Sequence, residues 1–170
     1  MNDQPISAPP APLPSRRFDS RDDFRQLVRD ALACATREGW REIILSDADF
    51  QDWPLGERAV AESLQAWSAG GRRMVLLARS YDGVLRQHAR FVQWRRLWSH
   101  IVTPLACAGA GRLEIPSALW SPAWVLERRD VDRSNGYCGS EPQRRVLLRE
   151  TLNEWLAKAT PAFPPTLLGL

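Results

Sequence analysis

Two short, almost wholly apolar runs constrain the fold more than any other feature of this chain. They are EIIL (42–45) and RMVLLA (73–78), and the segment between them carries Val60, Leu64 and Trp67 at helical spacing. An apolar run of this length is typical of a strand that is buried on both faces, as in a parallel sheet. Two parallel strands joined by a helix form a right-handed crossover unit. We therefore expect an α/β fold.

Helical patterns lie on both sides of these runs. The first helix is expected between Ser20, which forms an N-terminal capping pattern with Asp23, and Gly39, a residue that favours a helix end. A last helix is expected to start at Ser140, which begins the capping pattern S-x-x-Q. A long helix between them closes before Pro104. Its apolar stripe consists of Val84, Phe91, Trp94, Trp98, Ile101 and Val102.

The remaining strand signals lie in the C-terminal half. RLEI (112–115) resembles a third short strand, and Asn135-Gly136 after the segment 123–131 is typical of a two-residue hairpin turn. Together these elements predict a single mixed, mainly parallel sheet with helices on both faces and a C-terminal β-hairpin plus helix. We expect one domain over residues 18–160.

Proline-rich segments lie at both ends. Residues 1–17 are expected to form a flexible extended tail without the features of a secretory signal. Residues 161–170 are expected to form an extended apolar tail, because three prolines exclude a helix. This second tail predicts docking into a groove, either on its own domain or on a partner. Its apolar side chains are Phe163, Leu167, Leu168 and Leu170.

Charge and cysteine content narrow the classes of protein. All but one of the 23 basic residues are arginine, yet the net charge is only +3. The arginines suit contacts to phosphate, although a coding bias that replaces lysine by arginine explains them equally well. The three cysteines (Cys34, Cys107 and Cys138) are widely spaced, as in a protein of a reducing compartment. No run approaches a membrane span. We expect a cytoplasmic protein without a membrane contact.

Asp47 and Asp49 follow the first apolar run, where an α/β sheet places its ligands. A strand that ends in D-x-D is similar to the first motif of haloacid dehalogenase-type phosphatases. That chemistry also needs a lysine, and the only lysine is Lys158 in the last helix. The alternative is a turn in which the aspartates accept hydrogen bonds from the main chain, and we favour the turn.

The segment 90–100 interleaves arginines with aromatic residues. Such interleaving is found in grooves that bind single-stranded nucleic acid, where bases stack on aromatic rings and arginines contact phosphates. The aromatic residues share one helical stripe, however, and this spacing favours a core face. The candidate binding residues are Arg90, Trp94, Arg95, Arg96, Arg128 and Arg129.

Metal and cofactor sites are not indicated. His88 and His100 fall on different faces of one predicted helix, so they are not placed to share a metal. Neither a glycine-rich phosphate loop nor a zinc motif occurs in the sequence. We expect no metal and no cofactor.

The order of elements from about residue 41 to 158 resembles one half of a phospholipase D-like fold. The stretch 41–80 is similar to that family's opening, and Gly139-Ser140 is similar to the end of its catalytic motif. In that motif, H-x-K-x4-D, the acid falls on Asp132 or Asp130. The histidine then falls on Val125 or Ala123.

The lysine of the motif is also absent in both alignments: its position is Glu127 when the acid is Asp132, and Val125 when the acid is Asp130. The resemblance therefore implies a non-catalytic relative, since a covalent phosphohistidine requires the histidine. Active members pair two halves, which implies a homodimer or a protein partner for a single half.

Three functions follow from these patterns. The first is a non-catalytic module that binds phosphate, single-stranded nucleic acid or another polyanion. The second is a protein-interaction or dimerisation module without a nucleic-acid role. The third is a phosphatase-like hydrolase that uses Asp47 and Asp49. Salt dependence separates the first from the second, because binding to a phosphate backbone releases counterions.

Overall fold

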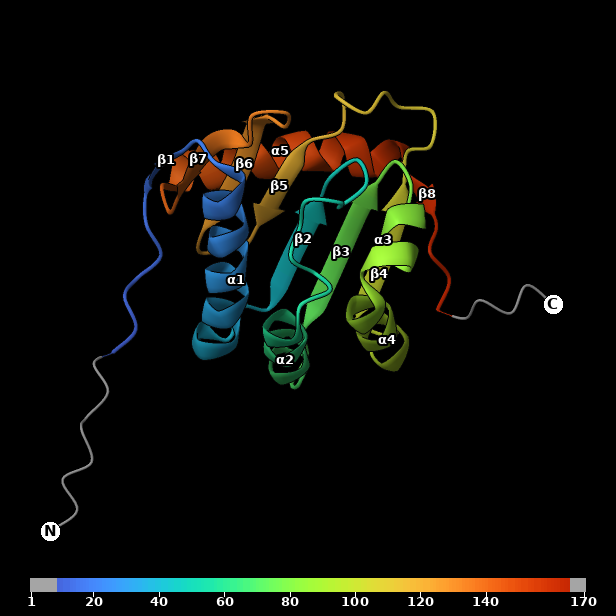
Figure 1. Cartoon of the computed structure of the whole chain (residues 1–170), viewed down its shortest axis with the longest axis horizontal. Helices are drawn as coiled ribbons and strands as arrows, with labels where there is room; N and C mark the ends of the chain where they lie inside the picture. Colours follow the sequence, from blue (N-terminus) through green and yellow to red (C-terminus); the bar gives the residue numbers. More distant parts are fainter. Residues whose placement is uncertain (1–8, 166–170) are drawn as a thin grey trace, which may run out of the picture.

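A computed structural model of the chain describes residues 9–165. Figure 1 shows one sheet with helices on both faces. The strands are β1 (Arg16–Phe18), β2 (Glu42–Ser46), β3 (Arg73–Ala78), β4 (Val102–Ala106), β5 (Ser117–Trp120), β6 (Val125–Asp130), β7 (Asn135–Gly139) and β8 (Thr160–Pro161). The helices are α1 (Arg21–Glu38), α2 (Arg58–Trp67), α3 (Asp82–Gln87), α4 (Ala89–Leu97) and α5 (Pro142–Lys158). Within the described part of the chain, no helix is long and apolar enough to cross a membrane.

The sheet is mixed, and most of its pairings are antiparallel. Its strand order is β1-β7-β6-β5-β2-β3-β4-β8. The two parallel pairs are β2 with β3 and β3 with β4, and every other neighbouring pair among the described strands is antiparallel. The α/β class is therefore confirmed, but the prediction of a mainly parallel sheet is wrong. The reason is that β5, β6 and β7 follow one another through short turns, which allow only antiparallel pairing.

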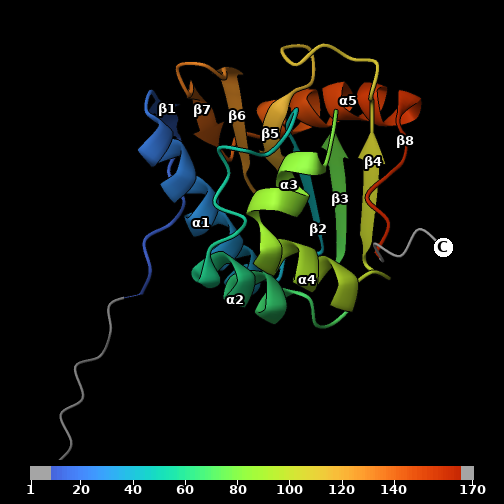
Figure 2. The ribbon, with the colours of Figure 1, turned by 45° about the vertical axis from the view of Figure 1, so that its right-hand side comes forward.

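The sheet separates two hydrophobic cores. Helices α1 to α4 cover one face, and α5 covers the other (Figures 1 and 2). Successive side chains of β2 alternate between them: Ile43 and Leu45 belong to the larger core, whereas Ile44 belongs to the smaller core with Leu148 and Leu152 of α5. Because both faces of β2 are covered, the strand is apolar at every central position.

Local signals place the first helix correctly. The Ser20 hydroxyl accepts a hydrogen bond from the Asp23 amide at 3.1 Å, and Gly39 ends the helix with a φ of 67°. Gly39 suits this end because a residue without a side chain adopts the left-handed conformation at little cost. The predicted cap and stop of α1 are confirmed.

Sequence periodicity is misleading between residues 84 and 120. The expected long helix is two helices, α3 and α4, and Val102 lies in strand β4. The segment 112–115, expected as a strand, forms a turn that precedes β5. Val102 matches the helical stripe, but its side chain is buried in the same core from a strand.

Asn135-Gly136 is not a hairpin turn. The turn between β6 and β7 is formed by residues 131–134, with Ser134 at a φ of 51°, and both Asn135 and Gly136 belong to β7. A side chain at Gly136 would collide with the main-chain carbonyl of Glu127 on β6, next to a register irregularity. Glycine is therefore required here by a close approach of two strands.

Residues of both proline-rich segments contact the domain. The Trp124 indole donates a hydrogen bond to the Pro14 carbonyl at 2.8 Å, and Leu13 packs against the larger core. At the opposite edge of the sheet β8 pairs with β4, and the Phe163 side chain lies in the larger core. The other apolar side chains of the C-terminal tail, those of Leu167, Leu168 and Leu170, lie outside the described residues.

The two faces of α5 predict unequal effects of the same substitution. Leu152 is fully buried under the sheet, whereas Leu147 is 62% exposed. We expect Leu152→Ala to lower the free energy of unfolding by about 2–5 kcal/mol through the cavity that it leaves. The matched variant Leu147→Ala should change it by less than about 0.5 kcal/mol. Urea denaturation measures both, and equal effects of the two variants would contradict the placement of α5.

Candidate functional site

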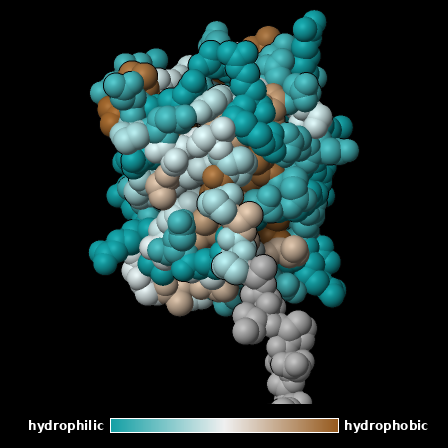
Figure 3. Space-filling model, turned by 90° about the vertical axis from the view of Figure 1, so that its left-hand side faces the viewer, coloured by the Kyte–Doolittle hydropathy of each residue, from teal (hydrophilic) through white to brown (hydrophobic). Residues whose placement is uncertain are grey.

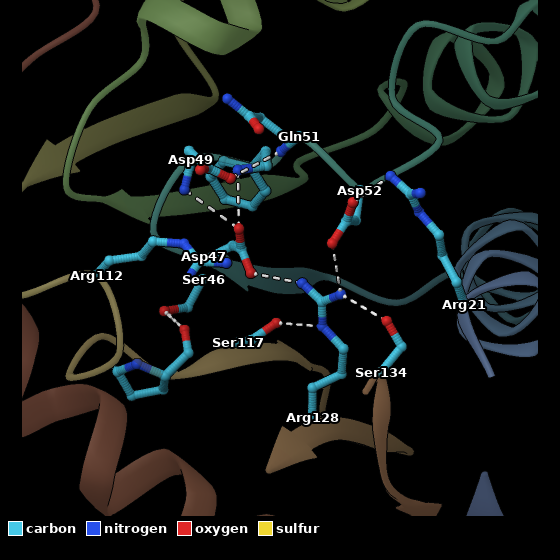
Figure 4. A network of polar contacts seen from close by, with 12 residues as sticks. Arg21, Ser46, Asp47, Asp49, Gln51, Asp52, Arg112, Ser117, Arg128 and Ser134 are labelled. Carbon is cyan, nitrogen blue, oxygen red and sulfur yellow. Dashed lines mark hydrogen bonds and ion pairs between the residues drawn. The ribbon is translucent and has the colours of Figure 1, made fainter. Parts of the chain in front are cut away.

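The aspartates after β2 form a turn (Figure 4). One carboxylate oxygen of Asp47 accepts hydrogen bonds from the amides of Asp49 at 3.2 Å and Phe50 at 2.8 Å. The Asp49 carboxylate in turn accepts one from the Gln51 amide at 3.0 Å. These contacts hold Phe50 at a φ of 58° with its side chain in the core. The D-x-D pattern therefore shapes the chain where it leaves β2.

Arg128 of β6 occupies the centre of this network. Its side chain is only 1% exposed, and its three nitrogens all have partners. They contact Asp47 at 3.0 Å, Asp52 at 3.2 Å, and the hydroxyls of Ser117 at 2.9 Å and Ser134 at 3.3 Å. These hydrogen bonds and ion pairs replace the contacts with water that the guanidinium loses when it is buried. Four of the five N–H groups of Arg128 donate to these partners, and the side chain is enclosed by the protein.

The same contacts bear on the phosphatase-like alternative. Asp47 is 3% exposed, and its second carboxylate oxygen faces the guanidinium of Arg128. A nucleophilic carboxylate needs an oxygen that a substrate can reach. Both oxygens of Asp47 are engaged within the protein, so the geometry favours the turn.

The other binding residues expected from the sequence do not form one surface. Trp94 lies in the core and donates a hydrogen bond from its indole to the Ser68 hydroxyl at 2.8 Å. Arg95 is also buried, whereas Arg90 and Arg96 are exposed on α4. The structure thus separates the buried members of the aromatic stripe from two exposed arginines. Arg129, the last of the six, is exposed on β6.

Arginines gather instead at the β1 edge of the sheet. A cleft of about 600 Å³ lies there, lined by Arg16 and Arg17 of β1, Arg129 of β6, Tyr137 of β7 and Arg144 at the start of α5. Figure 3 shows this side of the molecule, most of which is hydrophilic. The cleft was not predicted, because Arg16 and Arg17 were expected in a flexible tail. The paired arginines at 16–17, 128–129 and 144–145 were the available signal.

The arginines of the cleft differ in how their charge is compensated. Arg16 makes two hydrogen bonds to Asp23, at 2.7 and 2.9 Å, and these hold the pKa of the Asp23 carboxyl below its usual value. Arg144 stacks on the Tyr137 ring, with its guanidinium carbon 3.6 Å from the ring centre. Within residues 9–165, Arg17 and Arg129 have no carboxylate within ion-pair distance. These two carry the free positive charge of the cleft.

Metal-ligating side chains do not converge in the described residues. Among residues 9–165, no group of three or more histidine, cysteine, aspartate or glutamate side chains is placed to hold a metal ion. His88 is buried, and its ring nitrogen lies 2.8 Å from the Phe50 carbonyl. Burial lowers the pKa of His88, so the neutral form is favoured at this position.

Comparisons with known proteins give a likeness of fold but no family. The sequence matches no protein-family model and no curated protein. The structure is similar to that of TrmBL2, an archaeal chromatin protein whose structure is described as showing a novel mode of DNA binding. The TM-score is 0.65 at 14% sequence identity, over 93% of this chain and 58% of that chain. At this identity the likeness concerns the fold, and this chain corresponds to little more than half of TrmBL2.

This likeness corrects the resemblance to a phospholipase D-like half. The structural neighbour is a chromatin protein, and nothing in the comparisons points to a phospholipase D-like fold. The resemblance rested on the order of strands and helices between residues 41 and 158, which different α/β folds share. Two of its supports also fail in the structure, since 112–115 is a turn and Asn135-Gly136 lies within a strand.

The buried ion pair between Arg128 and Asp47 predicts a large effect of a substitution on stability. We expect Arg128→Met to lower the free energy of unfolding by about 3–5 kcal/mol, because it leaves the buried Asp47 carboxylate without its counter-charge. Arg129→Met, one residue further along the same strand but exposed, is the matched control and should change stability by less than about 0.5 kcal/mol. Chemical denaturation measures both variants. Equal stability of Arg128→Met and the unaltered protein would show that the network is not structural.

Proposed function

We propose that this protein is a non-catalytic module that binds the phosphate backbone of nucleic acid in the cleft at the β1 edge. One observation carries the proposal: four arginines from two strands and a helix line this cleft, and two of them, Arg17 and Arg129, have no carboxylate partner in the described residues. Exposed arginines without partners contact phosphate without first breaking an ion pair. The planar guanidinium also matches two phosphate oxygens at once.

The composition of the cleft favours a single strand. The Tyr137 ring lies within the cleft with the Arg144 guanidinium stacked against it, which places an aromatic side chain beside several positive charges. Proteins that bind single strands combine such aromatic platforms with a basic groove. Asp19 and Asp23 also line the cleft and reduce its net charge. We therefore expect weak binding without preference for base sequence.

The structural neighbour supports the proposal from a different direction. TrmBL2 is described as a DNA-binding chromatin protein, so its fold occurs in a protein that contacts nucleic acid. Fold likeness at 14% identity does not transfer a binding site. The proposed binding of nucleic acid by this chain therefore depends on the arginines of its own cleft.

Self-association is the second candidate function. Val146 is 57% exposed and Leu147 is 62% exposed, and with Pro142 they form an apolar strip on the outer side of α5. Adjacent exposed apolar side chains on one helix are typical of a surface that contacts another protein. This observation favours a homodimer through α5, a part of the molecule that the proposed cleft uses only at Arg144.

We expect the protein to bind a fluorescently labelled single-stranded oligonucleotide, with an affinity that falls steeply as salt rises. The double variant Arg17→Ala/Arg129→Ala should weaken binding and lower the slope of log affinity against log salt by about 1–2, as lost phosphate contacts require. Fluorescence anisotropy at several salt concentrations measures both quantities.

A matched control separates the cleft from general charge. Arg90→Ala/Arg96→Ala removes the same two charges from α4, outside the cleft, and should leave the salt slope unchanged. Asp23→Asn frees Arg16 from its ion pair and should strengthen binding. Equal losses in the two double variants, or binding that ignores salt, would contradict the proposed interface.

For self-association, we expect Val146→Glu/Leu147→Glu to shift the sedimentation equilibrium towards the monomer. Charged side chains in an apolar interface lose water without gaining partners, so they oppose contact between two copies. Both side chains are exposed in the single chain, and folding should therefore be retained. If the unaltered protein is already monomeric at high concentration, the proposed dimer is excluded.

A further inference from the structure

Arg95 of α4 is a buried cation without a counter-charge among the residues that the structure describes. It is 4% exposed, and no carboxylate of residues 9–165 lies within ion-pair distance of it. Its Nη2 donates one hydrogen bond, to the Phe163 carbonyl at 3.2 Å. Its Nε and Nη1 are buried and find no acceptor among the described residues. Arg128, by contrast, has a partner for each nitrogen.

This state is energetically unfavourable. A charged group that loses water and gains no opposite charge destabilises the folded protein. The pKa of Arg95 is lowered by its burial, which is the signature of that loss. The Phe163 ring, whose centre is 5.7 Å from the guanidinium carbon, makes a cation–π contact, but it leaves Nε and Nη1 without an acceptor among the described residues. An acceptor from outside the described chain would relieve this deficit.

A groove lies beside Arg95 at the β8 edge of the sheet. Its volume is about 520 Å³, and it runs between β4 and the segment 161–165. Among the described residues, Arg95 is the only charged side chain that lines it. The other lining residues are Val102, Thr103, Pro104, Leu105, Pro161, Ala162, Pro164 and Pro165. The groove therefore combines one buried positive charge with apolar walls.

The segment over Arg95 supplies a replaceable acceptor. Its Phe163 has a φ of 50°, a left-handed conformation that is strained in a residue other than glycine. The ring of Phe163 stacks on Tyr81 at 5.1 Å and so holds the segment in place. Strand β8 contributes only two residue pairs to the sheet. Because Nε and Nη1 of Arg95 are buried, a ligand reaches them only when this segment shifts.

We propose that this groove binds a small monocarboxylic acid with an apolar body, and that Arg95 pairs with its carboxylate. A carboxylate offers two oxygens to the guanidinium fork and cancels its single charge. A phosphate dianion would bring a second charge that nothing else in the groove compensates. The site does not depend on the proposed nucleic-acid interface, because β1 and β8 lie at opposite edges of the sheet (Figure 2).

The test uses 4-methylpentanoate as the probe and its neutral amide as the matched ligand. Titration of the full chain, followed by amide NMR, should give saturable shifts at Thr103, Leu105 and Phe163 with the acid. The amide should bind on the order of tenfold more weakly, because it lacks the charge that Arg95 recognises. Arg95→Met should bind acid and amide equally.

Three results would overturn the proposal. They are the absence of saturable shifts with the acid, equal binding of acid and amide by the unaltered protein, and acid binding that Arg95→Met retains in full. Displacement of the acid by equimolar inorganic phosphate would overturn the assignment to carboxylates. If Arg95→Met does not fold, Arg95→Lys keeps the charge without the fork, and it should bind the acid more weakly than the unaltered protein and still prefer it to the amide.

Discussion

The buried guanidinium of Arg128 connects three parts of the chain that are distant in sequence. From β6 it contacts Asp47 in the turn after β2, and it also contacts Asp52, which pairs with Arg21 at the start of α1 at 2.5 Å. Its carbon lies 4.2 Å from the centre of the Phe24 ring, so the same side chain also packs against α1. The position of α1 relative to the sheet, and of the β1 edge before it, depends on this one charge being satisfied.

Three kinds of arginine environment account for the properties we assign to this protein. Arg128 is buried with partners and stabilises the fold. Arg17 and Arg129 are exposed at the β1 edge, where water solvates their charge and a polyanion can replace that water. Arg95 is buried without an opposite charge in the described part of the chain, which is the environment that most favours a bound anion. The role of each arginine therefore depends on how deeply its guanidinium is buried and on whether a carboxylate lies next to it.

Prediction from the sequence succeeded where short-range patterns act. The cap at Ser20, the end at Gly39 and the turn at Asp47 are all local hydrogen-bonding choices. It did not distinguish Arg128 from Arg129, which look equivalent in a sequence. They lie on opposite faces of one strand, and which face is covered depends on the register with β5 and β7.

The amino-acid pattern alone was sufficient for the α/β class, for α1, and for β2 and β3 as buried parallel neighbours, because these depend on side-chain periodicity and nearby backbone contacts. The strand order, the short edge strands β1 and β8, and the partners of each arginine became known only from the folded chain. Their physical basis is long-range: Arg128 and Asp47 are 81 positions apart, and local propensity holds no information about a contact over that separation. Both proposed sites lie at sheet edges that such distant pairings create.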